Sequence, residues 1–381
     1  MKAPGEVIDA RFVGRVILKT LALLAAFNLA FALLQPLPLL GRFSAYNGLF
    51  PGRTRFPFGE NPEKSYNLSL YSVEAMFAAH ALAGAPKAPD EYRVFVLGDS
   101  SAWGTLLRPA ETLAGQLDAL HLERCGKTVR FYNLGYPTLS VLKDLMLLQE
   151  AKAYAPDLVL WPLTLQSLPY AKQLASPLVA NNPARVDDLL ARWPSIRLDP
   201  GDPQLARPDF WQRTFFGQRR ALSDLLRFQA YGVPWAATGI DQEYPADYPP
   251  AQRDLEADES FMDFEPHDLP AEGLAWEVIA AGVEAAAPAP VWLINEPMLV
   301  STGKNSEIRY NFFYPRWAYD RFREMLVERS AMEGWTLLDL WDLVPQAEFT
   351  NSAIHLSPAG SIRLAERVAD ALGGASCPID E

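Results

Sequence analysis

The stretch RVFVLGDSSAWG, residues 93–104, decides the fold. It begins with a short apolar run that ends at Gly98, which is typical of a strand buried on both faces. Asp99 and Ser100 follow on the turn that leaves this strand. Ligands of open α/β sheets bind at the edge where the strands end, so this turn places the Ser100 hydroxyl at a binding edge. A Gly-Asp-Ser string alone is weak, because it also occurs by chance in ordinary turns.

An alternation of strands and helices continues from this stretch toward the C-terminus. Apolar runs predict strands at 93–97, 128–134, 158–161, 290–295 and 335–340. Amphipathic patterns predict helices at 112–123, 140–154, 271–286, 316–333 and 357–372. This alternation indicates a three-layer α/β sandwich whose five-stranded sheet is parallel and flavodoxin-like in order.

Residues 166–270 interrupt the alternation. A structureless loop of this length is improbable, so we interpret them as an inserted, mainly helical cap with helices near 184–192 and 213–231. Residues 91–381 then form the main domain. Residues 42–90, rich in Gly, Pro and Asn at first, are interpreted as a linker followed by a lead-in helix.

The N-terminal segment, residues 1–41, has a different character. No charged residue occurs from Thr20 to Leu40, which is about the length needed to cross a bilayer. The cations before it are Lys2, Arg11, Arg15 and Lys19. The positive-inside tendency predicts a single-pass signal anchor with a cytoplasmic N-terminus and an extracytoplasmic main domain. The alternatives are a cleaved signal peptide with a site near residues 30–32, or a buried core helix.

The chain is acidic, with a net charge of −12 at pH 7, which argues against a nucleic-acid partner bound through a basic surface. The segment Asp241 to Asp268 holds ten acidic residues and one arginine. The predicted cap helix carries Arg213, Arg219, Arg220 and Arg227. These charges are interpreted as solvated surface with internal ion pairs. The alternative is that the arginines contact anionic lipid or an anionic substrate polymer.

A serine nucleophile requires a base within hydrogen-bond reach. Of the four histidines, His355 lies just before the last predicted helix, on the loop after the fifth predicted strand. In a parallel sheet this loop opens at the same edge as Ser100, so we predict that His355 is the base. The other three, His80, His121 and His267, are interpreted as structural or solvated.

Three short blocks, in this order, resemble the SGNH (GDSL-like) hydrolases. They are Gly98-Asp99-Ser100, Asn133-Leu134-Gly135 and the HLSPAG stretch at 355–360. The resemblance covers about 91–165 and 289–381. It implies a serine esterase or acyl-transfer enzyme without a cofactor, in which the amides of Ser100 and Gly135 stabilise the oxyanion.

Two blocks depart from the family pattern. The family's third block supplies an asparagine, and here Thr164 or Gln166 would have to replace it. The last block lacks its aspartate, so a third triad member is absent or is one of Asn351, Ser352, Asp339 and Asp342. A Ser-His dyad stabilises the imidazolium less well and would be slower. The alternative function is therefore a non-catalytic envelope protein that binds glycan or a membrane partner.

Other polar residues near the strand ends are candidates for substrate contacts, because an oxygen-rich ligand needs donors and stacking surfaces. They are Asp99, Ser101, Asn133, Asn295, Asn305, Arg309, Tyr310 and Tyr314. Packing of the loop at 301–319 against the cap is the alternative. A membrane-tethered SGNH domain resembles proteins of envelope-polymer modification. By that analogy the expected substrate is an acylated glycan or another surface ester, with a membrane protein as a further partner.

The two cysteines, Cys125 and Cys377, are too few for a zinc site, and no metal is expected. In a flavodoxin-like order the first and last helices share one face and run parallel. Each cysteine follows one of these helices, so both lie at corresponding ends. We therefore predict a disulfide between them, which an oxidising exterior permits.

Overall fold

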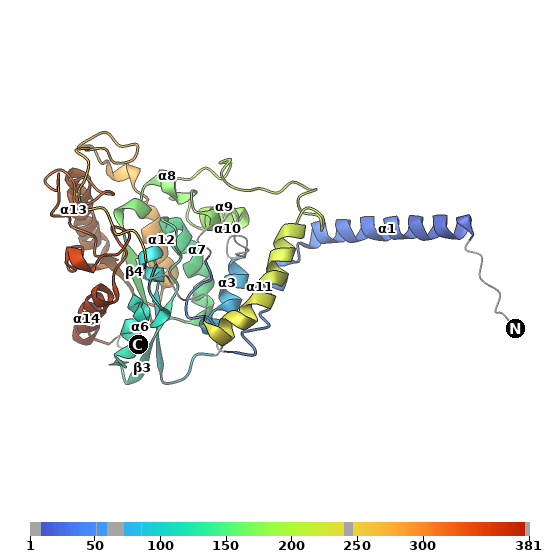
Figure 1. The fold of residues 1–381 in the computed structure, drawn as a ribbon, viewed down its shortest axis with the longest axis horizontal. Coiled ribbons are helices and arrows are strands. Elements are labelled where there is room, and N and C mark those ends of the chain that lie inside the picture. The colour runs from blue at the N-terminus through green and yellow to red at the C-terminus, as the bar shows by residue number, and fades with distance from the viewer. Residues whose placement is uncertain (1–8, 51, 59–71, 85, 240–246, 378–381) are drawn as a thin grey trace.

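A parallel sheet forms the centre of the computed structural model, which describes residues 9–50, 52–58, 72–84, 86–239 and 247–377 (Figure 1). The strand order is β2-β3-β1-β4-β5-β6. The strands are β1 (Glu91–Val96), β2 (Glu123–Arg124), β3 (Lys127–Asn133), β4 (Leu158–Leu163), β5 (Val291–Asn295) and β6 (Thr336–Asp339). Strands β1, β4 and β5 are buried along their whole length, which explains the apolar sequence of β4, of most of β5 and of the second half of β1.

The prediction of a five-stranded, wholly parallel sheet was wrong in one respect. The five predicted strands are present and parallel. A sixth, β2, pairs antiparallel with the edge strand β3. The predicted helix 112–123 includes Glu123, the first residue of β2, but the helix ends at Ala119. Cys125 and Gly126 both have positive φ and form the two-residue turn of this hairpin.

Helices cover both faces of the sheet and make three layers. One face carries α6 (Leu113–Ala119) and α14 (Pro358–Gly374). The other face carries α7 (Val141–Ala151), α12 (Trp276–Ala286) and α13 (Arg316–Glu333). Helix α12 approaches β4 so closely that a Cβ at Gly282 would lie 2.3 Å from the Trp161 ring.

The segment predicted as a cap packs against several parts of the molecule. Its helices are α8 (Tyr170–Gln173), α9 (Pro177–Ala180), α10 (Pro183–Arg192) and α11 (Arg219–Thr238). Val186 and Leu189 of α10 join the core that lies under α7. Helix α11 instead packs through Phe228 on Tyr46, in the segment that follows α1. The acidic part runs beside the loop after β5, where the Leu255 amide bonds to the Lys304 carbonyl at 3.0 Å.

The segment predicted as a linker and lead-in contains α2 (Leu37–Gly41), α3 (Val73–Ala79) and α4 (Ala81–Gly84). Its described part is well packed rather than extended. Phe56 is fully buried in the main core, and its carbonyl accepts a 2.8 Å hydrogen bond from the Trp103 indole. This segment therefore supports the turn that carries Ser100.

Helix α1 (Ala10–Leu34) projects from the body of the molecule (Figure 1). Its mean hydropathy is 2.1, and by length and composition it is long and apolar enough to cross a membrane. Most of its side chains are exposed, which is contrary to the core-helix alternative. The predicted span continued to Leu40, but the helix ends at Leu34 because Gln35 is left-handed and Pro36 cannot continue the hydrogen-bond ladder.

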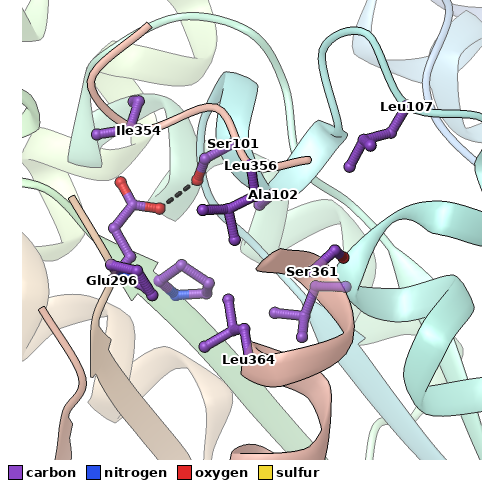
Figure 2. A pocket seen from close by; sticks show the side chains of 11 residues that line it. Ser101, Ala102, Leu107, Glu296, Ile354, Leu356, Ser361 and Leu364 are labelled. Atoms are coloured by element: carbon purple, nitrogen blue, oxygen red, sulfur yellow. Dashed lines mark hydrogen bonds between the residues drawn. The ribbon is translucent and has the colours of Figure 1, made fainter. Parts of the chain in front are cut away.

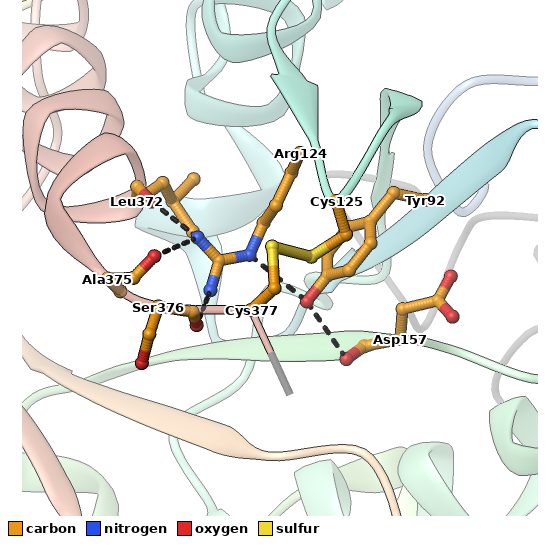
Figure 3. Close-up of a disulfide and its surroundings, with 8 residues drawn as sticks. All are labelled: Tyr92, Arg124, Cys125, Asp157, Leu372, Ala375, Ser376 and Cys377. Carbon is orange, nitrogen blue, oxygen red and sulfur yellow. Dashed lines mark hydrogen bonds between the residues drawn. A yellow bond between two sulfur atoms is a disulfide. The ribbon is translucent and has the colours of Figure 1, made fainter. Parts of the chain in front are cut away.

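A disulfide joins Cys125 to Cys377, with their Cα atoms 5.7 Å apart (Figure 3). It connects the β2–β3 turn to the segment that follows α14, and α6 packs against α14 on the same face, as the helix arrangement predicted. Arg124 makes a second connection between these parts. Its guanidinium donates to the carbonyls of Leu372 at 2.5 Å, Ala375 at 3.1 Å and Ser376 at 3.0 Å.

We expect no free thiol in the denatured, unreduced protein and two after reduction, measured by thiol titration. The disulfide closes a long loop, so the variant Cys125→Ser/Cys377→Ser should lose about 2–5 kcal/mol of unfolding free energy. Two titratable thiols without reduction, or unchanged stability of the double variant, would contradict this cross-link.

Candidate active site

Ser100 is held by a tight turn at the end of β1. Gly98 has a φ of +122°, and a Cβ there would lie 2.9 Å from the Ala102 Cβ, so glycine is required. The Asp99 carboxylate then caps the short helix α5 (Ser100–Trp103) by accepting a 2.8 Å hydrogen bond from the Ser101 amide. Ser100 is thereby the first residue of a helix at the carboxyl edge of the sheet.

The structure brings Ser100 and His355 together. The Ser100 hydroxyl lies 2.8 Å from His355 Nε2, although 255 positions separate the two residues. The other ring nitrogen, Nδ1, lies 2.8 Å from Asn351 Oδ1. An amide oxygen can only accept, so Nδ1 carries the hydrogen and Nε2 presents its lone pair to the hydroxyl. This tautomer is the one that a general base requires.

Backbone hydrogen bonds hold the loop that carries His355. Phe349 and Leu356 form an antiparallel bridge across its base. The Thr350 amide and hydroxyl both donate to the His355 carbonyl, at 2.9 and 3.2 Å. At its far side, the Ala353 carbonyl accepts from the Leu299 amide at 2.7 Å. The loop is therefore fixed to the segment after β5.

Burial lowers the pKa of His355 to about 4. The imidazole is consequently neutral around neutral pH and is able to accept a proton there. Asn351 orients the ring without adding a negative charge, so it does not stabilise the imidazolium as a carboxylate does.

Of the four candidates for a third triad member, Asn351 contacts His355 and the others are placed elsewhere. Asp339 accepts from Asn295 at 2.7 Å and from Arg323 at 2.8 Å, so it belongs to a separate ion pair. Asp342 is exposed on the loop after β6. Ser352 makes no hydrogen bond to His355 in the described part of the chain.

The predicted oxyanion donors differ in availability. The Ser100 amide has no acceptor among the described residues, so it is open to a ligand. The Gly135 amide already donates to Asn133 Oδ1 at 3.0 Å. The buried hydroxyl of Thr164 is hydrogen-bonded to the Tyr314 hydroxyl. In this arrangement the Gly135 amide and the Thr164 hydroxyl therefore both take part in internal hydrogen bonds.

Gly135 and Asn133 position the turn instead. A Cβ at Gly135 would lie 2.5 Å from the Trp103 amide nitrogen, so only glycine lets this loop approach α5. The Asn133 side-chain amide donates to the carbonyls of Ala102 at 2.8 Å and Trp103 at 3.3 Å. Asn133 is buried and fully engaged, which corrects its prediction as a substrate contact.

Most of the other predicted substrate contacts are also internal to the fold. Asn295 bridges Asp339 and the Tyr319 hydroxyl, and Asn305 donates to the Leu255 carbonyl at 2.7 Å. Arg309 is buried and donates to the carbonyls of Asp258 and Ser260 at 2.6 and 3.1 Å. The buried Tyr310 donates to Asp320 at 2.8 Å, and Tyr314 is fully buried. Asn305 and Arg309 thereby join the loop after β5 to residues 255–260.

A buried lysine that was not predicted as a site residue holds the turn that carries Ser100. Lys143 of α7 has no exposed side-chain surface. Its ammonium donates to the Gly98 carbonyl at 2.7 Å and to the Tyr136 carbonyl at 2.9 Å, and it pairs with Asp144 at 2.7 Å. It therefore ties the Ser100 turn to the loop after β3. A Lys-Asp pair among the apolar residues of the first two turns of α7 is the signal in the sequence.

A small pocket lies beside this turn, with Glu296 and Ser101 at one wall (Figure 2). The Glu296 carboxyl accepts a short hydrogen bond from the Ser101 hydroxyl, and its second oxygen is buried without a partner in the described structure. The apolar lining includes Ala102, Leu356 and Leu364. Ser101 and Asp99, predicted as substrate contacts, thus belong to this wall and to the helix cap respectively.

Burial and the nearby Asp99 carboxyl raise the pKa of Glu296 well above its ordinary value. Burial also raises the pKa values of Asp99 and Asp144, against the lowering effect of Lys143. One ammonium cannot compensate three buried carboxylates, so burial and the neighbouring charge both disfavour ionisation of Glu296. Among the described residues no group of three His, Cys, Asp or Glu side chains is arranged to hold a metal.

No family model matches the chain, and no curated protein matches it in sequence. Similar solved structures include a lipolytic protein of the G-D-S-L family from Veillonella parvula, at 10% identity and TM-score 0.36, covering 74% of this chain and 99% of that one. A carbohydrate acetylesterase from Sinorhizobium meliloti is 14% identical, with TM-score 0.33 and coverage of 74% and 98%. The aryl esterase of M. smegmatis is 13% identical, with TM-score 0.32 and the same coverage. Because these values are low, any function must be argued from the site itself.

We expect Glu296→Gln to change the pH dependence of stability. At a pH above the ordinary pKa of glutamate, Glu296 is ionised in the unfolded chain and takes up a proton on folding. The free energy of unfolding of the wild type therefore falls as pH rises from the ordinary to the raised pKa. Glutamine is neutral at every pH, so the variant should gain on wild type by up to about 1.4 kcal/mol per pH unit in that window. Urea unfolding over a pH series measures this difference.

The exposed Glu324 of α13 provides the matched control, because Glu324→Gln should show no such trend. A constant difference between Glu296→Gln and wild type across the pH series would show that Glu296 is ionised in the folded protein.

Proposed function

We propose that this chain is an SGNH-type serine hydrolase that cleaves or transfers an O-acyl ester. The observation that carries the proposal is the Ser100–His355–Asn351 relay, in which both hydrogen bonds are 2.8 Å long. A hydroxyl on the first residue of a helix, with a neutral imidazole as its acceptor, is the arrangement that activates serine. Ser100 and His355 lie in the short blocks that resemble the SGNH hydrolases, and Asn351 lies four residues before the last block.

In the proposed reaction the Ser100 oxygen attacks the ester carbonyl while His355 Nε2 takes its proton. The tetrahedral intermediate collapses when the imidazolium returns that proton to the leaving alkoxide, which leaves an acyl group on Ser100. His355 then deprotonates water, or the hydroxyl of an acceptor, which attacks the acyl-serine and releases Ser100. Hydrolysis and transfer share this intermediate, and they differ only in the second nucleophile.

The oxyanion is stabilised first by the Ser100 amide, which has no acceptor among the described residues. Gln166 is our candidate for a second donor. It follows β4 at the same sheet edge, is partly exposed, and its side-chain amide makes no hydrogen bond within the described structure. One such donor contributes about 3–4 kcal/mol to the transition state.

We further propose that α1 anchors the enzyme in a membrane with its N-terminus cytoplasmic, so that the main domain acts outside. The exposed apolar surface of α1 and the cations at its start support this orientation. The disulfide supports an oxidising location. The proposed substrate is accordingly an acylated envelope glycan or another surface ester.

A non-catalytic binding protein is the second candidate. It is favoured by the engaged Gly135 amide and by an amide, rather than a carboxylate, beside His355. Such a protein would keep the same turn and pocket but would not form an acyl-enzyme.

A fluorophosphonate probe should label the wild-type protein and not Ser100→Ala, because the probe reacts with an activated serine. Ser101→Ala should retain the label and controls for its neighbour. The measurement is probe fluorescence in a gel, with intact mass as confirmation. Wild-type protein that folds but takes no label would favour the binding protein.

Asn351→Asp should raise kcat/KM by roughly tenfold or more, because a carboxylate stabilises the imidazolium that forms in the transition state. It should also raise the His355 pKa from about 4, so the acid limb of the pH–rate profile moves to higher pH. Ala347→Asp adds the same charge at an exposed position four residues away and is the matched control. An acid limb that does not move in Asn351→Asp would exclude His355 as the base.

A further inference from the structure

A loop between α10 and α11 lies against the C-terminal end of α1. This aromatic loop, residues 208–218, has the sequence PDFWQRTFFGQ. The Phe215 ring meets Phe27 at 5.1 Å and Phe31 at 5.7 Å, centroid to centroid. The Phe216 amide donates to the Asn28 side chain at 3.2 Å.

Two further polar contacts fix the loop at the C-terminal end of α1. The Gln35 side chain donates to the Arg213 carbonyl at 3.2 Å and accepts from the Gln218 side chain at 3.2 Å. The loop is therefore bound along the last two turns of α1, and Phe31 is buried beneath it.

Large apolar side chains are exposed on this loop and beside it. Trp211 is 74% exposed and Phe216 is 52% exposed. Leu33 and Leu34 at the end of α1 are at least 70% exposed. The one acidic residue of the loop, Asp209, accepts a 2.8 Å hydrogen bond from the Gln212 amide. Large apolar side chains gathered at one place on a surface mark an interaction site.

The position of the loop along α1 indicates which partner covers it. Nineteen residues separate Arg15 from Leu34, which is about 28 Å of helix, whereas the hydrocarbon core is about 30 Å thick. A bilayer that begins near Arg15 therefore reaches the end of α1. Asn28 and Phe31 lie three to six residues before that end, at a depth of roughly 5–9 Å. A loop packed against them cannot stay above the lipid.

The composition of the loop fits this depth. Trp side chains are favoured at the membrane–water interface, and Trp and Phe both occur on the apolar faces of segments that lie in it. Arg213 within the loop and Arg219 just after it are exposed at the same place, so they can reach lipid phosphates. The apolar side chains and the cations are thus both complementary to the surface of an anionic bilayer leaflet.

We propose that the aromatic loop inserts into the membrane–water interface on the extracytoplasmic side and forms a second membrane contact beside α1. This inference rests on the proposed anchor. A single helix lets the domain rotate about its own axis, whereas two adjoining contacts fix the orientation of the domain. Helices α13 and α14 lie at the end of the body away from α1, so they would project from the membrane (Figure 1).

The test uses the full chain in vesicles of phosphatidylcholine and phosphatidylglycerol. The variant Trp211→Cys is labelled with a thiol-reactive nitrobenzoxadiazole fluorophore, which the disulfide-bonded native cysteines do not take up. Quenching is measured with lipids that carry a nitroxide near the headgroup and, separately, with lipids that carry it deep in the acyl chain. Met332→Cys is the matched control, because Met332 is equally exposed at 74% but lies in α13. Leu23→Cys reports on α1 itself.

The expected result is quenching of the label at position 211 at least about twofold stronger than at position 332. Quenching at position 23 with equal, weak quenching at 211 and 332 would overturn this inference and leave the anchor intact. A label at position 23 that lipid nitroxides at any depth fail to quench would overturn the anchor and, with it, the second contact.

Discussion

The hydrogen bond from the Ser100 hydroxyl to the His355 ring requires two loops from opposite ends of the main domain to meet at one sheet edge. Parallel strand order satisfies this requirement, because every strand delivers its following loop to the same edge. Ser100 follows β1 near the middle of the sheet, and the His355 loop follows the edge strand β6. The segment after β5 joins them by bonding to Ala353 and Ser101.

Buried charge under this edge sets its electrostatics. Lys143 neutralises Asp144 and bonds to two backbone carbonyls of the loops above, so it fixes their relative position. The pKa of Glu296 beside Ser101 is raised, because further negative charge is poorly compensated there. His355 is kept neutral by the same low polarity. Charge therefore develops at this site only during the reaction with a substrate. Preorganised donors act most strongly on such developing charge.

The five parallel strands, the Ser100–His355 pair and the disulfide could be predicted from the sequence. Buried strands leave continuous apolar runs and helices leave local start signals, and the strand order then places the loops and helix ends. The sequence predicted the functions of individual polar residues less well. Arg309 and Asn295 looked like ligand contacts, yet they hold loops, since a buried backbone carbonyl recruits a polar side chain as readily as a substrate does. Asn351 was one of four candidates, and only the loop geometry distinguishes it from Asp339.

A mutant cycle of Ser100→Ala and His355→Ala tests the relay most directly, with hydrolysis of a p-nitrophenyl ester as the readout. Residues that act as one catalytic unit are strongly non-additive. We predict that each single variant and the double variant lose kcat by a similar factor, roughly 10⁴-fold or more. Losses that multiply in the double variant, or full activity in either single variant, would contradict a shared proton between these two residues.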